Sequence, residues 1–223
     1  MSGLGSFREN AIRFVVNLFA RNMLVCVLVY SCWIAIINYN YWFSWHVILC
    51  TLGIIPFMTE ALMLFAPDEL WSRQLTRTQK YGVHGFLMVG GTILLSVGCI
   101  DTFYYISEGY HLYTVHGITG LISMILLILS IIFGYMANYS QKLTKYGRPV
   151  FFKFNHNFVG LLGYLIGVVS LCYAFYTHWF VYFTTEASRL VAVIATILGV
   201  LWTMNAAIVS GYHQIKTLLV LRN

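Results

Sequence analysis

Residues 43–53 read FSWHVILCTLG and place a histidine, His46, at the start of a run that stays almost wholly apolar to Phe65. About 20 consecutive apolar residues are enough to cross a bilayer as a helix. An imidazole buried in such a helix costs free energy unless something binds it. The stretch therefore predicts a membrane-spanning helix with a bound histidine near one of its ends.

The remainder of the chain has the same apolar character. Of its 223 residues, 60% are hydrophobic and only 9% are charged, which excludes a disordered chain and is typical of membrane proteins. Six apolar runs are long enough to span a bilayer, at about residues 22–40, 46–66, 83–100, 114–137, 157–176 and 190–211. We expect an all-α integral membrane protein with an N-terminal segment 1–21, a six-helix domain 22–212 and a C-terminal tail 213–223.

The basic residues predict how the chain is oriented. All but Arg189 of the 13 Lys and Arg residues lie in the termini, between the second and third runs, or between the fourth and fifth runs. By the positive-inside rule, both termini are expected in the cytoplasm. This bias also explains the net charge of +6, and since no nucleic-acid motif occurs we expect no nucleic-acid partner. The first 21 residues lack a small-residue cleavage site, so we expect no removable signal peptide.

Four of the seven histidines lie near the N-terminal ends of four successive runs, namely His46, His84, His116 and His156. Because successive membrane helices run in opposite directions, His46 and His116 are expected near the non-cytoplasmic face, and His84 and His156 near the cytoplasmic face. The two histidines at each level lie on helices two apart in sequence. Such helices can be diagonal neighbours that face the centre of a four-helix bundle.

The two levels should be roughly 20 Å apart in a hydrocarbon core of about 30 Å, too far for one zinc ion to bind all four histidines. Two histidines do, however, complete the axial ligands of a haem iron, so two haems would account for all four. A single membrane histidine could instead be an ordinary hydrogen-bonding core residue, a reading that four histidines paired by level weaken. The chain has five cysteines but no CxxCH, which excludes covalent c-type haem.

Glycines accompany the histidines along the same runs. Small residues there could leave room for a flat porphyrin or could let helices pack closely, and both interpretations stay open. The glycines concerned are Gly85, Gly90, Gly91, Gly117, Gly120, Gly160, Gly163 and Gly167.

One histidine in each of four central helices of a six-span chain resembles the cytochrome b561 family. So do the stretches SWHVILCTLGIIPFMTEALMLFAPDE and KFNHNFVGLLGYLIG, and the resemblance extends from about Phe43 to the sixth span. It implies a transmembrane reductase with two non-covalent haem b groups, in which His46 pairs with His116 and His84 with His156. It further implies electrons taken from cytoplasmic ascorbate and passed to monodehydroascorbate radical or a ferric chelate on the luminal or extracellular side. We expect an endoplasmic reticulum or vesicle membrane and a homodimer.

Further residues are candidates for handling substrate. Ascorbate is an anion, so basic residues beside the cytoplasmic histidines could bind it, although the positive-inside rule would place cations there in any case; they are Lys80, Lys153, Arg77 and Arg148. His111 could serve the acceptor side or shuttle a proton, or be an ordinary loop histidine. Glu60 lies about 21 Å along the helix from His46. It could hydrogen-bond a ligand histidine or carry a proton, or else reach interfacial water or Arg73.

Two other classes of protein stay open. A quinol-linked membrane cytochrome b subunit would need quinol rather than ascorbate as its reductant. A proton or metal transporter would contain no haem, so a visible absorption spectrum separates it from the other two.

Overall fold

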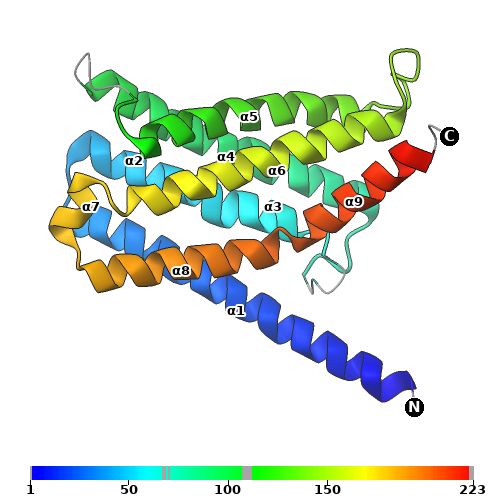
Figure 1. The fold of residues 1–223 in the computed structure, drawn as a ribbon, viewed down its shortest axis with the longest axis horizontal. Helices are drawn as coiled ribbons and strands as arrows, with labels where there is room; N and C mark the ends of the chain where they lie inside the picture. The colour runs from blue at the N-terminus through cyan, green and yellow to red at the C-terminus, as the bar shows by residue number, and fades with distance from the viewer. Residues whose placement is uncertain (1, 67–68, 70, 107–111, 221–223) are drawn as a thin grey trace.

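The structure, a computed structural model, describes residues 2–66, 69, 71–106 and 112–220. Within these residues all regular structure is helical, as Figure 1 shows. The elements are α1 (Ser2–Ile37), α2 (Tyr41–Leu52), the π-helix η1 (Gly53–Met58), α3 (Thr59–Met63), α4 (Arg77–Tyr105), α5 (Val115–Asn138), α6 (Pro149–Ala174), α7 (His178–Phe183), α8 (Glu186–Thr203) and α9 (Asn205–Val220).

In the part of the chain that the structure describes, six helical stretches are long and apolar enough to cross a membrane, which confirms the predicted fold class. They are Ala11–Ile37, Tyr41–Met63, Arg77–Tyr105, Val115–Asn138, Pro149–Ala174 and Glu186–Thr203. The outer boundaries differ from the sequence prediction. α1 is one continuous helix from Ser2, so most of the segment 1–21 is helical, because isolated arginines such as Arg13 and Arg21 interrupt an apolar pattern without ending a helix. The sixth span ends at Thr203, and most of the expected tail 213–223 belongs to α9.

Two antiparallel helix hairpins form the centre of the molecule (Figure 1). In hairpin A, the continuous stretch α2–η1–α3 packs against α4; in hairpin B, α5 packs against α6. α1 and α8 pack on each other and flank the hairpins, as expected for spans without membrane histidines. Buried apolar side chains join these parts, among them Leu24 from α1, Ile54 from η1 and Val168 from α6.

The two ends of the bundle differ in charge. Figure 1 shows both chain termini, the α3–α4 connection and the α5–α6 connection at one end, while α7 lies at the other. The first of these is called the basic end here, because all the Lys and Arg residues of the sequence except Arg189 lie in or next to the termini and these two connections. His84 and His156 lie near the starts of α4 and α6, which begin at the basic end. His46 and His116 lie near the starts of α2 and α5, at the opposite end.

Most of the glycines noted in the sequence pack helices together. A Cβ on Gly53 would lie 2.6 Å from the Gly91 carbonyl oxygen, so η1 and α4 approach each other too closely there for any larger residue. In hairpin B, Gly120, Gly160 and Gly167 lie against serine side chains and Gly163 against leucines, while Gly90 and Gly117 also meet neighbouring side chains. Gly85 differs, since a Cβ there would meet nothing within 4 Å. Close helix packing is thus confirmed for most of these positions.

The π-helix η1 interrupts the second span. Pro56 lies within it and has no amide hydrogen to donate, and the Thr59 N–H bonds to the Ile54 carbonyl, five residues back, instead of four. Such a π-turn adds one residue to a helix without lengthening it by a full α-helical step. The register of every residue after η1 is therefore shifted by one relative to an uninterrupted α-helix.

Candidate functional site

The four membrane histidines meet as two pairs, one near each end of the bundle. The rings of His46 and His116 face each other with centroids 5.8 Å apart and planes at 79°. Those of His84 and His156 have centroids 5.9 Å apart and planes at 90°. Each pair takes one histidine from hairpin A and one from hairpin B, in the combination that helix direction predicts.

Every one of these imidazoles is anchored through Nδ1 to a main-chain carbonyl. A carbonyl oxygen only accepts hydrogen bonds, so Nδ1 carries the hydrogen in all four rings and Nε2 keeps its lone pair. The Nδ1-to-oxygen distances are 3.0 Å for His46 to Gly98, 3.1 Å for His84 to Ala61, 3.0 Å for His116 to Ser170 and 2.9 Å for His156 to Ser130.

The four anchors follow one rule, since each histidine bonds to a carbonyl on the other helix of its own hairpin. In three of the four helices, the anchoring carbonyl lies at the same distance in sequence after that helix's own histidine: Gly98 after His84, Ser130 after His116 and Ser170 after His156. Ala61 follows His46 by one residue more. The extra residue is the one that η1 inserts, so the π-helix brings the Ala61 carbonyl, rather than that of Glu60, to His84.

Two serines reinforce the anchors in hairpin B. Ser170 Oγ donates to the His116 carbonyl at 2.8 Å and lies 3.0 Å from its Nδ1. Ser130 Oγ likewise donates to the His156 carbonyl, at 3.4 Å, and lies 3.3 Å from the His156 Nδ1. Sequence reasoning missed both serines, although the matched spacing from the two histidines was a signal that could have found them.

The paired rings fit an axial donor set for a metal. Two metal–nitrogen bonds of about 2 Å each would place the ring centroids about 6 Å apart, close to the 5.8 and 5.9 Å observed. Each ring has a free Nε2, and the hydrogen bond from Nδ1 to a carbonyl fixes the orientation of the ring, as in metal-binding histidines generally. Within the described ranges, no three His, Cys, Asp or Glu side chains gather to hold a metal ion by themselves. The histidines therefore supply two donors per site, which suits a metal whose other ligands come with it, as in haem.

Aromatic rings lie beside both pairs on the hairpin A side. The centroid of the Phe43 ring lies 5.8 Å from that of His46 and 5.1 Å from that of Trp179 in α7. At the basic end, Phe65 contacts the His84 ring at 5.3 Å and Tyr81 at 5.8 Å. Each pair is thus connected by aromatic contacts towards its own end of the bundle, an arrangement that the sequence did not predict.

The predicted substrate-binding cations all lie at the basic end. Arg77 and Lys80 are on the first turn of α4, Arg148 immediately precedes α6, and Lys153 is on the first turns of α6. Arg77 is held in place, since its Nε donates to the Tyr81 hydroxyl at 2.7 Å. Lys80 is half-buried, whereas Lys153 is exposed.

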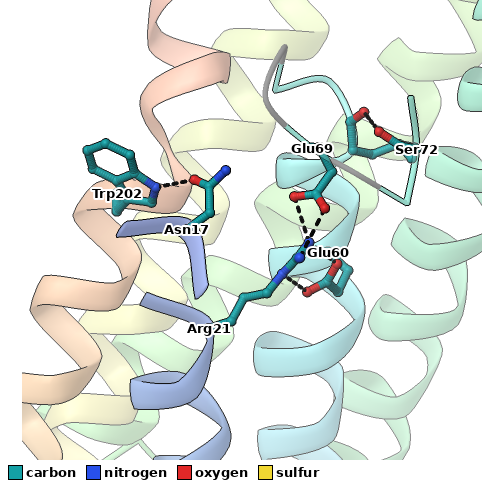
Figure 2. A network of polar contacts seen from close by, with 7 residues as sticks. Asn17, Arg21, Glu60, Glu69, Ser72 and Trp202 are labelled. Carbon is teal, nitrogen blue, oxygen red and sulfur yellow. Dashed lines mark hydrogen bonds and ion pairs between the residues drawn. The ribbon is translucent and has the colours of Figure 1, made fainter. Parts of the chain in front are cut away.

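Glu60 has a different partner from either one proposed from the sequence. Its carboxylate accepts hydrogen bonds from Arg21 of α1, at 2.8 Å from Nε and 2.7 Å from Nη2, and Arg21 also binds Glu69 (Figure 2). The side chain thus bonds Arg21 rather than a ligand histidine or Arg73, and a role for Glu60 beside the histidines stays a prediction. Sequence reasoning missed Arg21, because the contact between an α1 side chain and Glu60 cannot be predicted from either segment alone. His111, the acceptor-side candidate, lies outside the described residues.

Two facing histidine pairs in a six-helix membrane bundle form an arrangement that suits the binding of haem within a membrane. The chain belongs to the eukaryotic cytochrome b561 family, whose family model matches residues 45–181. Haem b binding and transmembrane electron transfer follow from that membership.

Three mammalian proteins that share one name are similar to this chain. Over 165 residues the chain is 32% identical to the Transmembrane reductase CYB561D2 of Mus musculus, 31% identical to that of Homo sapiens and 30% identical to that of Bos taurus. Each alignment covers 73% of this chain and 74% of the relative.

Proposed function

We propose that this chain is a transmembrane reductase with two haem b groups, which takes electrons from cytoplasmic ascorbate and delivers them to monodehydroascorbate radical or a ferric chelate across the membrane. The observation that carries this proposal is the pair of facing imidazoles near each end of the bundle. Its family and the name of its mammalian relatives support an oxidoreductase.

The four histidines would hold the two haems as axial ligands, His46 with His116 and His84 with His156. When bound in this way, haem has no open coordination position, so it exchanges single electrons and does not activate oxygen. The chain supplies orientation and electronic tuning. Each Nδ1–H donates to a carbonyl, which makes the imidazole a stronger donor through Nε2.

The basic end is proposed to face the cytoplasm and to receive ascorbate. The positive-inside rule supports this orientation, and the anionic donor would be attracted to Arg77, Lys80, Arg148 and Lys153. Of these, Arg77 is the best placed to act near the histidines. Tyr81 fixes its guanidinium, and Tyr81 contacts Phe65, which contacts the His84 ring.

The opposite end is proposed to face the lumen of the endoplasmic reticulum or of a vesicle and to reduce the acceptor. His111 is the candidate there for contacting the acceptor or moving a proton. We further propose that the chain acts as a homodimer in the bilayer, by analogy with its family.

Sealed vesicles carrying the purified full chain and trapped ferric citrate test the function. We expect a b-type absorption spectrum that ascorbate added outside reduces, followed by Fe(II) inside. In the matched control His46→Leu, ascorbate should still reduce the remaining haem while Fe(II) fails to appear inside. Reduction by quinol but not by ascorbate would support a quinol-linked cytochrome instead. A purified protein with no haem bands would contradict the proposal outright.

A further inference from the structure

Arg21 of α1 holds two carboxylates from different parts of the chain at once. Its guanidinium makes two contacts to Glu60, at 2.7 and 2.8 Å, and two to Glu69, at 2.8 and 3.0 Å. Figure 2 shows the guanidinium between the two carboxylates, one from α3 and the other from the connection that follows it. Glu69 is 3% exposed, so removing its cationic partner would leave a buried charge unpaired, which costs more than breaking a surface ion pair.

The two carboxylates bracket the end of α3, where the anchor of His84 lies. Glu60 is adjacent to Ala61, whose carbonyl accepts the His84 Nδ1–H at 3.1 Å. Ala61 is in the last turn of α3, and carbonyls in the last turn of a helix lack main-chain donors, which leaves this one free for the imidazole. Beyond it, Ser72 Oγ donates to the Leu64 carbonyl at 2.9 Å and folds the connection back on α3 (Figure 2).

The π-helix explains why the Arg21 contact and the histidine anchor are neighbours. The extra residue in η1 gives the anchoring position to Ala61, and Glu60, one residue earlier, directs its carboxylate to α1. α3 is the C-terminal end of the continuous helix of the second span, and the carbonyls of its last turn have few main-chain donors to fix them. Contacts from outside the helix must therefore supply much of the rigidity at Ala61.

We propose that Arg21 is a positioning residue for His84: by holding Glu60 and Glu69 together, it fixes the Ala61 carbonyl and so the orientation and basicity of the imidazole. Arg21 lies outside residues 45–181 that match the family model, whereas Glu60, Ala61, Glu69 and His84 lie inside. The outer helix α1 thus acts on the redox site although it contributes no ligand. The inference rests on the proposed haem site at His84 and His156.

The contacts of Arg21 to Glu60 and Glu69 are called the clamp below. Weakening this clamp has a predictable electronic consequence. If the Ala61 carbonyl is less well held, the His84 Nδ1–H donates a weaker hydrogen bond and the imidazole becomes a poorer electron donor. A poorer donor stabilises ferric iron less than before, so the midpoint potential of that haem should rise. The haem between His46 and His116 has anchors at Gly98 and Ser170, which the clamp does not touch.

The test is a redox titration of the haem-loaded full chain with Arg21→Lys. Lysine keeps the positive charge but has three donors, fewer than the four contacts that Arg21 makes, so direct electrostatics change little while the clamp is lost. We expect one of the two midpoint potentials to rise and the other to stay where it is. The control Trp202→Phe removes a different α1 contact, the one from the indole N–H to Asn17, and should move neither potential.

Glu60→Asp provides a second variant if Arg21→Lys yields little protein. It keeps the negative charge but shortens the side chain by one methylene and so weakens its contacts to Arg21, and it should raise the same potential. Unchanged potentials in Arg21→Lys, or an equal rise of both, would overturn the inference while leaving the proposed function standing. A wild-type chain without two titrating haems would contradict the proposed function itself, and the inference with it.

Discussion

His46 of α2 and His116 of α5 face each other with ring centroids 5.8 Å apart, and each is anchored independently through Nδ1, to Gly98 and to Ser170. The spacing between the rings is therefore set by two hairpins that are each internally fixed. The same holds at the basic end for His84 and His156. A site built in this way is rigid before any ligand binds, which favours fast electron exchange with little reorganisation.

Gly134→Ala should damage the site at the basic end selectively. A Cβ at Gly134 would lie 3.0 Å from His156 Cε1 and 3.1 Å from its Nδ1, so the ring would have to move and its bond to the Ser130 carbonyl would weaken. We expect the chain to lose part or all of one haem, measured as haem per chain and as a changed visible spectrum.

Gly82→Ala is the matched control, because a Cβ there would meet nothing within 4 Å. It should keep the full haem content and be as stable as the wild type or more so, since alanine favours a helix by about 1 kcal/mol over glycine. Equal haem loss in the two variants would show that the close approach at Gly134 is unimportant.

Lys80→Gln combined with Lys153→Gln should weaken the response to ascorbate without removing haem. Each lysine lies on the first turns of a helix that carries one histidine of the basic-end pair. Losing two cations should raise the ascorbate concentration needed for half-maximal reduction by about 3- to 10-fold at low salt, and by less at high salt. Steady-state titrations of the reduced haem band at two salt concentrations measure this.

Lys216→Gln serves as the control for those two lysines, because it removes one cation from α9 at the same end of the bundle. It should leave the ascorbate dependence nearly unchanged. If all these variants behave alike, the lysines contribute only to the general positive potential of that end.

Tyr164→Phe should lower stability but not redox function. The Tyr164 side chain is 1% exposed, and its hydroxyl lies 2.9 Å from Thr59 Oγ, a contact that ties α6 to α3. Losing one buried hydrogen bond costs about 1 kcal/mol, or about 2 to 4 °C in melting temperature for a chain of this size. A thermal melt of the detergent-solubilised protein followed by the haem band checks it, and a shift in either midpoint potential would show that Tyr164 also acts on the haem sites.

The pairing of the histidines could be predicted from sequence because it depends only on helix direction. Each of His46, His84, His116 and His156 lies near the start of a span, and alternation of spans then assigns its level. The packing role of most glycines was left open for a physical reason. A glycine allows another group to pack closely against the helix, but the sequence does not show which group that is. Gly53 against Gly91 is such a case.

The surroundings of Glu60 could not be predicted, because two long-range features decide them. η1 shifts the register after Pro56 by one residue, so distance along an ideal helix no longer tells which group faces His84. The partner of the carboxylate, Arg21, comes from α1, a helix that carries none of the four paired histidines. The Lys80, Lys153, Arg77 and Arg148 assignments stay predictions, since the positive-inside rule places cations at that end whether or not they bind substrate.

The number of haems per chain in paired histidine variants tests the two-haem arrangement most directly. The wild type should hold two haems, measured as haem b against protein concentration. Replacing both members of one facing pair, His46→Leu with His116→Leu, should leave one haem. Replacing one member of each pair, His46→Leu with His84→Leu, should leave none, although both variants lack two histidines. Equal haem content in the two double variants, or a wild-type chain that holds a single haem, would contradict the pairing.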